Sequence, residues 1–184
     1  MTMGLLDEKK RNNIASYVIS MWHIEDLMRA NDLDIAKVDE LLIAPMDADE
    51  EAKQEVRDWY QDIILQMKEE GLEQQGHLSE VEEVINELEL LHRTLVEVVD
   101  DSDYEALYEA AKPGIISLQS QADDQAEGPI TTCFTAIYGV MLLRAQGKEV
   151  SESTAEAEGH MRLLLEALGL HYKHMRKLPG VSMN

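Results

Sequence analysis

The sequence predicts an all-α protein, an antiparallel bundle of about six to seven helices, for three reasons. Apolar side chains recur every three or four residues along most of the chain, which is the spacing of one helix face. No segment shows the sustained alternation of apolar and polar residues that a half-buried strand requires. Glycine, proline and helix-capping residues separate the periodic segments at short intervals. We therefore expect neighbouring helices to pack on one another around an apolar core.

The N-terminal part of the chain contains three predicted helices. The first has apolar residues at helical spacing, and Asp34 is placed to cap the short second helix. Pro45 prevents that helix from continuing, because its ring removes a backbone donor. Asp47 and Glu50 form a capping-box pattern at the start of the third helix. The predicted ranges are residues 6–30, 34–42 and 48–70.

Two further capping boxes start the next helices, Ser79 with Glu82 and Ser102 with Glu105. The helix that begins near Ser102 meets Pro113, where we expect it to stop or kink, because proline removes a donor and crowds the preceding turn. A short helix follows the proline. The predicted ranges are residues 79–99, 102–112 and 115–122.

The C-terminal part contains two predicted helices. Pro129 follows a glycine and stands where proline is favoured, at the first helical position. Gly147 ends this helix, and Ser153 with Glu156 forms a capping box for the last one. The predicted ranges are residues 129–147 and 153–177.

The length of 184 residues predicts a single helical domain over residues 1–184, with a kink or break near 112–114 and a flexible end at 178–184. Cys133 is the one cysteine, so an intramolecular disulfide is excluded. No stretch approaches the roughly 18 apolar residues of a membrane span, and no apolar run precedes the first charges as in a signal peptide. We expect a cytoplasmic protein.

The balance of charge limits the classes of partner. The chain has 16 Lys and Arg residues against 37 Asp and Glu residues, which gives a net charge of −21. Nucleic acids and anionic membrane surfaces need clustered cations, so we expect neither as a partner. Most of the acidic residues are expected to form a solvated surface.

Metal-binding patterns are incomplete in this sequence. Glu89 and His92 form one Glu-x-x-His motif, but a carboxylate-bridged dinuclear site needs two of them. Glu80 and Glu83 have the spacing that all-helical pyrophosphatases use for magnesium, yet Glu83 projects away from the apolar face and no partner motif is recognisable. No phosphate loop, nucleophile elbow or dinucleotide fingerprint occurs. We expect no metal, no cofactor and no catalytic residue.

Charged residues inside two very apolar helices provide the main candidate site. The helix from Pro129 to Gly147 has one charged residue, Arg144, and helical projection places it within the apolar arc. A guanidinium is costly to bury alone, so it must reach solvent or meet a carboxylate such as Glu25 or Asp26 of the first helix. We therefore hypothesise a ligand-binding pocket or a buried polar network between these two helices, formed by Trp22, His23, Asp26, Arg29, Tyr138 and Arg144. The alternatives are an internal ion pair that sets helix register or an arginine that extends into solvent, and we favour these two over a binding site.

Five segments spread over nearly the whole chain carry a family resemblance: YVISMWHIEDLMRANDLDI, WYQDIILQM, GHLSEVEEVINELELLH, YEALYEAAKP and CFTAIYGVMLLR. They resemble segments of an uncharacterised all-helical bacterial family of about this length, a domain of unknown function. The resemblance implies a compact helical domain in a bacterial cytoplasm. It implies no activity and transfers no functional residue.

The leading functional hypothesis from sequence is a non-enzymatic helical interaction or scaffold protein that associates with itself as a homo-oligomer. Its basis is that no complete catalytic set is present, while the helices carry more apolar faces than a small monomeric bundle needs. A metal-dependent hydrolase of phosphorylated small molecules, using clustered glutamates, is the first alternative. A binder of small anionic ligands near Arg29 and Arg144 is the second.

Overall fold

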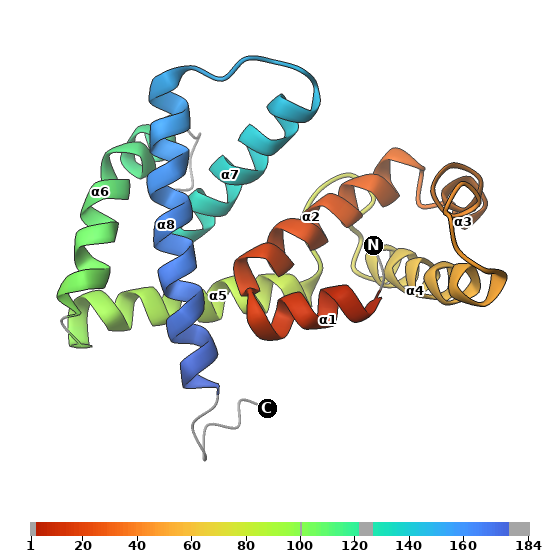
Figure 1. Ribbon diagram of the computed structural model, residues 1–184, viewed down its shortest axis with the longest axis horizontal. Coiled ribbons are helices and arrows are strands. Elements are labelled where there is room, and N and C mark those ends of the chain that lie inside the picture. The colour runs from red at the N-terminus through yellow and green to blue at the C-terminus, as the bar shows by residue number, and fades with distance from the viewer. Residues whose placement is uncertain (1–2, 100, 122–126, 177–184) are drawn as a thin grey trace. The chain divides into compact units, whose positions relative to one another are not determined.

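The computed structural model confirms the all-α class (Figure 1). It describes residues 3–99, 101–121 and 127–176, and none of these lies in a β-strand. Within this part of the chain there are eight α-helices and two short π-helical segments, η1 and η2, each of which extends the helix before it. The elements are α1 (Met3–Asn12), α2 (Ile14–Ala30), α3 (Ile35–Val38), η1 (Asp39–Ile43), α4 (Glu50–Glu69), α5 (Ser79–Thr94), η2 (Leu95–Val99), α6 (Ser102–Gln119), α7 (Pro129–Ala145) and α8 (Glu152–Met175).

The chain divides into two compact units. Unit 1 comprises Met1–Lys10 and Ser16–Glu83, and unit 2 comprises Arg11–Ala15 and Val84–Asn184. The expectation of a single domain over residues 1–184 stays a prediction, and the end expected to be flexible, 178–184, lies outside the described residues. None of the helices in the described part of the chain is both long enough and apolar enough to cross a lipid bilayer.

Two helix boundaries differ from the prediction. The first predicted helix is divided at Asn13 into α1 and α2, and α6 continues through Pro113 to Gln119 where we expected two helices. Proline inside a helix costs about 3 kcal/mol, so packing must compensate for it. Next to Pro113, Gly114 lies so close to α8 that an added Cβ would stand 2.9 Å from the Met161 Cε atom. The tight packing on α8 holds α6 in one piece; a kink within it stays a prediction.

The helix caps lie close to the predicted positions but are mostly different residues. Asp34 caps α3 as expected, accepting from the Ala36 N–H at 2.9 Å. The other caps are Asp49, which accepts from the Ala52 N–H, Asp101 and Ser151. In each case several capping residues lie close together in sequence, and the residue that caps the helix has extended backbone geometry. The capping boxes predicted from Asp47, Ser102 and Ser153 are therefore wrong by one or two residues.

The core of unit 1 is formed largely by α2 and α4. α2 buries the face with Tyr17 and Met21 and also Val18 and Trp22, which lie about 100° further around the helix, so more than one side of this apolar helix is covered. The buried residues of α4 recur at helical spacing along one face: Val56, Tyr60, Ile63, Ile64 and Met67.

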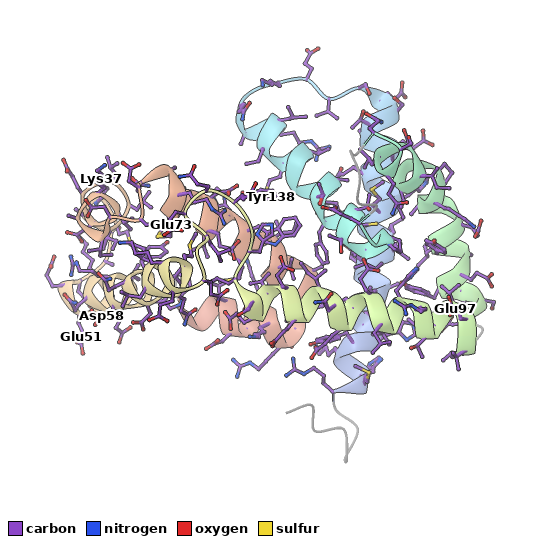
Figure 2. All side chains as sticks on the ribbon, turned by 180° about the vertical axis from the view of Figure 1, so that it is seen from behind. Lys37, Glu51, Asp58, Glu73, Glu97 and Tyr138 are labelled. Carbon is purple, nitrogen blue, oxygen red and sulfur yellow. The ribbon has the colours of Figure 1, made fainter. Side chains whose placement is uncertain are left out.

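The core of unit 2 lies between α6, α7 and α8. α6 and α8 pack side by side and run in opposite directions (Figure 1). α7 contacts both of them and diverges from α8 towards its own C-terminal end, where a loop leads into α8. α7 buries Ile130, Cys133, Phe134 and Ile137, so its apolar sequence is explained by burial. Exposed acidic side chains, including Glu51, Asp58, Glu73 and Glu97, form the solvated surface expected from the composition (Figure 2).

Candidate functional site

The segment of α2 around Glu25 binds the connection between α4 and α5. The Glu25 carboxylate is fully buried; one oxygen accepts from the Leu78 N–H at 3.0 Å and the other lies 2.6 Å from His77 Nδ1. The His77 ring in turn stacks on the indole of Trp22, with ring centroids 4.3 Å apart. Glu25 therefore holds the start of α5 by its backbone and its neighbouring side chain.

Arg29 completes this set of contacts, which we call the α2 clasp: Trp22, Glu25, Asp26 and Arg29. The Arg29 Nε donates to the Leu72 carbonyl at 3.0 Å, and one terminal nitrogen donates to the Gly76 carbonyl. The other terminal nitrogen lies 2.9 Å from the Asp26 carboxylate. Among the six residues predicted to form a site, the structure thus brings Asp26 and Arg29 into contact. His23 lies half-buried on the same helix.

The α2 clasp also holds the loop between α4 and α5, which the sequence indicates only by its two glycines. Gly71 and Gly76 have φ values of 71° and 92°, which side chains rarely tolerate. Ser79, predicted to cap α5, instead donates its N–H and hydroxyl to the Glu70 carboxylate at 2.8 and 2.9 Å. The roles of Glu25 and His77 were missed at the sequence level; the one available signal was a carboxylate in an otherwise apolar stretch.

Tyr138 and Arg144 lie on α7, in unit 2. Tyr138 is buried, and Arg144 is paired with Glu158 of α8, with 3.3 Å between the nearest nitrogen and oxygen. Glu158 also accepts from Arg162 on the next turn of α8, through Nε at 2.9 Å and a terminal nitrogen. The carboxylate is buried, while both guanidinium side chains are half exposed. Arg144 thus has a buried carboxylate partner while its own side chain is half exposed to solvent, and the hypothesis of one pocket joining all six residues stays a prediction.

A groove of about 830 Å³ lies between α6, α7 and α8. Its walls carry apolar side chains, including Leu118, Val140, Leu143 and Met161, and small residues that leave the space open, such as Gly139. A Cβ atom added at Gly139 would meet nothing within 4 Å. A volume of this size lies at the upper end of the range of roughly 300–1,000 Å³ for ligand-binding pockets.

The charges along this groove are of one sign. Among the described residues that line it, the charged ones are Glu127, before α7, and Glu158. Glu127 is exposed and accepts from the Thr135 hydroxyl at 3.2 Å. Arg144 and Arg162 reach Glu158 but are not part of the lining. The groove is therefore an apolar channel with carboxylates in its wall.

The Glu89-x-x-His92 pair serves helix packing in this fold. The Glu89 carboxylate accepts from the N–H groups of Ile130 and Thr131 at 3.0 and 2.8 Å, so it caps the start of α7 in place of a residue of that helix. His92 Nδ1 lies 2.8 Å from the Tyr104 hydroxyl. Within the described residues, no group of three or more His, Cys, Asp or Glu side chains is placed to hold a metal ion.

His92 and Cys133 are buried groups with shifted pKa values. Burial lowers the pKa of His92 to about 4, and the neighbouring Arg93 adds to the shift. Burial raises the pKa of the Cys133 thiol to about 12, with a further contribution from Glu89. The thiol is therefore protonated and unreactive at neutral pH, as expected from its place on the inward face of α7.

Replacing Glu25 by alanine tests the α2 clasp. The change leaves the Leu78 N–H without its acceptor in a buried place, and we expect it to lower the free energy of unfolding by about 2 kcal/mol or more. The control is Asp26→Ala, because this half-exposed carboxylate pairs at the surface and its loss should cost no more than about 1 kcal/mol. Denaturant titration of the native chain and the two variants measures both losses of stability. Equal losses would show that Glu25 does not hold the loop between α4 and α5.

His92 makes stability depend on pH. Its pKa in the folded chain, about 4, lies below the ordinary value of 6.5, so between these values the unfolded chain binds a proton that the folded chain does not. Stability should therefore fall as the pH is lowered from 6.5 towards 4. We expect His92→Gln to reduce this slope and the exposed control, His174→Gln, to retain it. Thermal unfolding between pH 5 and 7 gives the slopes, and an unchanged slope in His92→Gln would contradict the assignment.

The sequence of the chain matches one protein-family model. The family model described as "Domain of unknown function (DUF4924)" matches residues 3–178. No curated protein and no solved structure matches the chain. The family match confirms the resemblance to an uncharacterised family, while a bacterial origin stays a prediction. Because the matched segment spans nearly the whole sequence, the chain belongs to the DUF4924 family of domains of unknown function.

Proposed function

We propose that this chain is a non-enzymatic helical interaction protein, and that the groove between α6, α7 and α8 holds an amphipathic helix of a partner protein. The observation that supports this function is the groove itself, an apolar channel of about 830 Å³ in the surface of unit 2. The cytoplasm stays the expected location.

The dimensions of the groove suit a short helix. Its lining on α7 runs from Thr132 to Leu143, which is about 17 Å along the axis at 1.5 Å per residue. This is about three helical turns, enough for apolar anchors at positions i, i+3, i+4 and i+7 of a bound helix. Leu118 and Leu143 are partly exposed at 39% and 37%, so the walls offer apolar surface that a partner can cover.

The two alternatives from the sequence are less well matched to this surface. A small anion near Arg144 would be repelled by Glu127 and would have to compete with Glu158, which already pairs with Arg144 and Arg162. A hydrolase acting through clustered glutamates would need Glu80 and Glu83, but Glu80 already accepts from the Tyr17 hydroxyl and lies 3.6 Å from the Lys10 Nζ atom.

Filling the groove tests this proposal. Gly139→Leu places a side chain in open space inside the groove, whereas the matched control, Gly159→Leu, adds the same side chain to α8 at a position that also has nothing within 4 Å and does not line the groove. Both changes remove a helical glycine, so both should stabilise the fold by up to about 1 kcal/mol.

The measurement is fluorescence anisotropy with a labelled, uncharged helical peptide of leucine and glutamine, about fourteen residues or four turns long. We expect saturable binding to the native chain and to Gly159→Leu, and at least about tenfold weaker binding, 1.4 kcal/mol, to Gly139→Leu. Equal binding to the three proteins, or no binding to any, would contradict the proposal.

Self-association is a second candidate, supported by a different surface. α8 exposes Leu163 and Leu170 at 50% and 58%, and their spacing of seven residues places them on one face of the helix. We expect light scattering to show a dimer that Leu163→Gln together with Leu170→Gln converts to a monomer. Because the net charge is −21, dimerisation should strengthen as salt is raised. A monomer at every concentration and salt would exclude this candidate.

A further inference from the structure

We infer that the helix received by the groove is basic, with lysine or arginine residues that pair with Glu127 and Glu158. This inference rests on the proposed function, and it specifies the chemistry of the partner. It follows from the charges in the wall of the groove and around it.

The first argument is the sign of the charges that a bound helix would meet. The described lining contains two carboxylates, Glu127 and Glu158, and no lysine or arginine. An acidic partner would bring like charges together in a partly desolvated groove, which is costly, whereas a basic partner gains ion pairs there. The apolar lining between these residues, with Val140 and Met161, suits the apolar face of the same helix.

The second argument is that the Glu158 carboxylate can accept a further hydrogen bond from a cation of the partner. One oxygen accepts both contacts from Arg162, while the other is approached by Arg144 at 3.3 Å. A carboxylate has about four lone-pair sites, so the oxygen near Arg144 can accept another donor. The Arg144 guanidinium is half exposed, whereas the Glu158 carboxylate is buried and needs a cationic partner. A cation of the partner that takes the place of Arg144 keeps this carboxylate paired while Arg144 moves into solvent.

Arg144 accordingly competes with the cation of the partner for the Glu158 carboxylate. Together with Arg162, Arg144 offsets the charge of Glu158. Glu127 accepts from the uncharged Thr135 hydroxyl, so its charge is not offset by that contact and attracts a basic partner more strongly than Glu158 does. Removing the Arg144 charge should therefore strengthen binding of a basic helix, while removing the Glu127 charge should weaken it. A groove that bound through apolar contact alone would respond to neither change.

The third argument is the field of the whole chain. With 37 acidic and 16 basic residues, the net charge of −21 attracts basic segments over distances of about a Debye length, roughly 10 Å at 0.1 M salt. This attraction accelerates encounter but does not select a site, so the test must separate binding in the groove from attraction to the surface.

The experiment compares three labelled peptides with the same leucine positions and with lysine, glutamine or glutamate elsewhere. Binding is measured by anisotropy at low and at high salt to the native chain and to Glu127→Gln, Arg144→Gln, Gly139→Leu and Gly159→Leu. We expect the lysine peptide to bind best and the glutamate peptide not to bind. Glu127→Gln should weaken the lysine peptide about threefold, and Arg144→Gln should strengthen it about threefold.

The outcomes separate the two proposals. Glutamine and lysine peptides that bind equally well, with no effect of Glu127→Gln or Arg144→Gln, would overturn the basic partner and leave the groove as an interaction site. A lysine peptide that binds Gly139→Leu as well as Gly159→Leu would show attraction to the acidic surface only, and would also overturn the inference. Binding of none of the peptides would overturn both proposals. Because Glu127 and Arg144 are exposed, Glu127→Gln and Arg144→Gln should leave the core of unit 2 undisturbed.

Discussion

The N–H groups at the start of a helix need acceptors, and in this chain buried or half-buried carboxylates from other helices supply them at α5 and α7. Glu25 of α2 accepts from Leu78 just before α5, and Glu89 of α5 accepts from Ile130 and Thr131 of α7. A negative charge is favourable there because the helix dipole presents its positive end. Because these carboxylates are buried or half-buried, leaving one of them without a partner would lower the free energy of unfolding.

The same contacts position the segments between helices. The α2 clasp binds backbone carbonyls on both sides of the glycine-containing connection through Arg29, so this loop is held by side chains of a helix distant in sequence. At the start of α7, Gly128 packs directly against the Glu89 carboxylate, and any larger residue there would displace it. In unit 2 the result is a fixed start of α7, from which the helix diverges from α8 and leaves the groove between them.

Helix type and the inward faces could be predicted from the sequence because they depend on spacing, which is a local property. The inward face of α2 illustrates this, as does the proline at the start of α7. Projection also placed Arg144 within the apolar arc of α7, which is wrong, because its side chain lies near the helix end and is half exposed. Helix ends were less predictable, since adjacent capping residues such as Asp47 and Asp49 compete and only backbone geometry decides between them. α6 continues through Pro113 where Gly114 packs closely on α8, and no local pattern in the sequence indicates this contact between distant segments.

The candidate site was predicted in part for the same reason. Asp26 and Arg29 are three residues apart on one helix, so their contact follows from helical geometry, whereas the pairing of Arg144 with Glu158 needs the packing of α7 on α8. Glu25 was considered only as a candidate partner of Arg144, because its acceptor role at Leu78 requires knowing where α5 begins. The groove has no sequence motif, because three separate helices form it.

The ion pair between Arg144 and Glu158 has a mechanical consequence. It joins α7 to α8 near the end of α7 where the two helices diverge (Figure 1), so it acts as a tie across the open side of unit 2. The Arg144 side chain is half exposed, and dissolved ions screen such a pair. Salt therefore weakens this tie, although less than it would weaken a fully exposed pair, because the Glu158 carboxylate is buried.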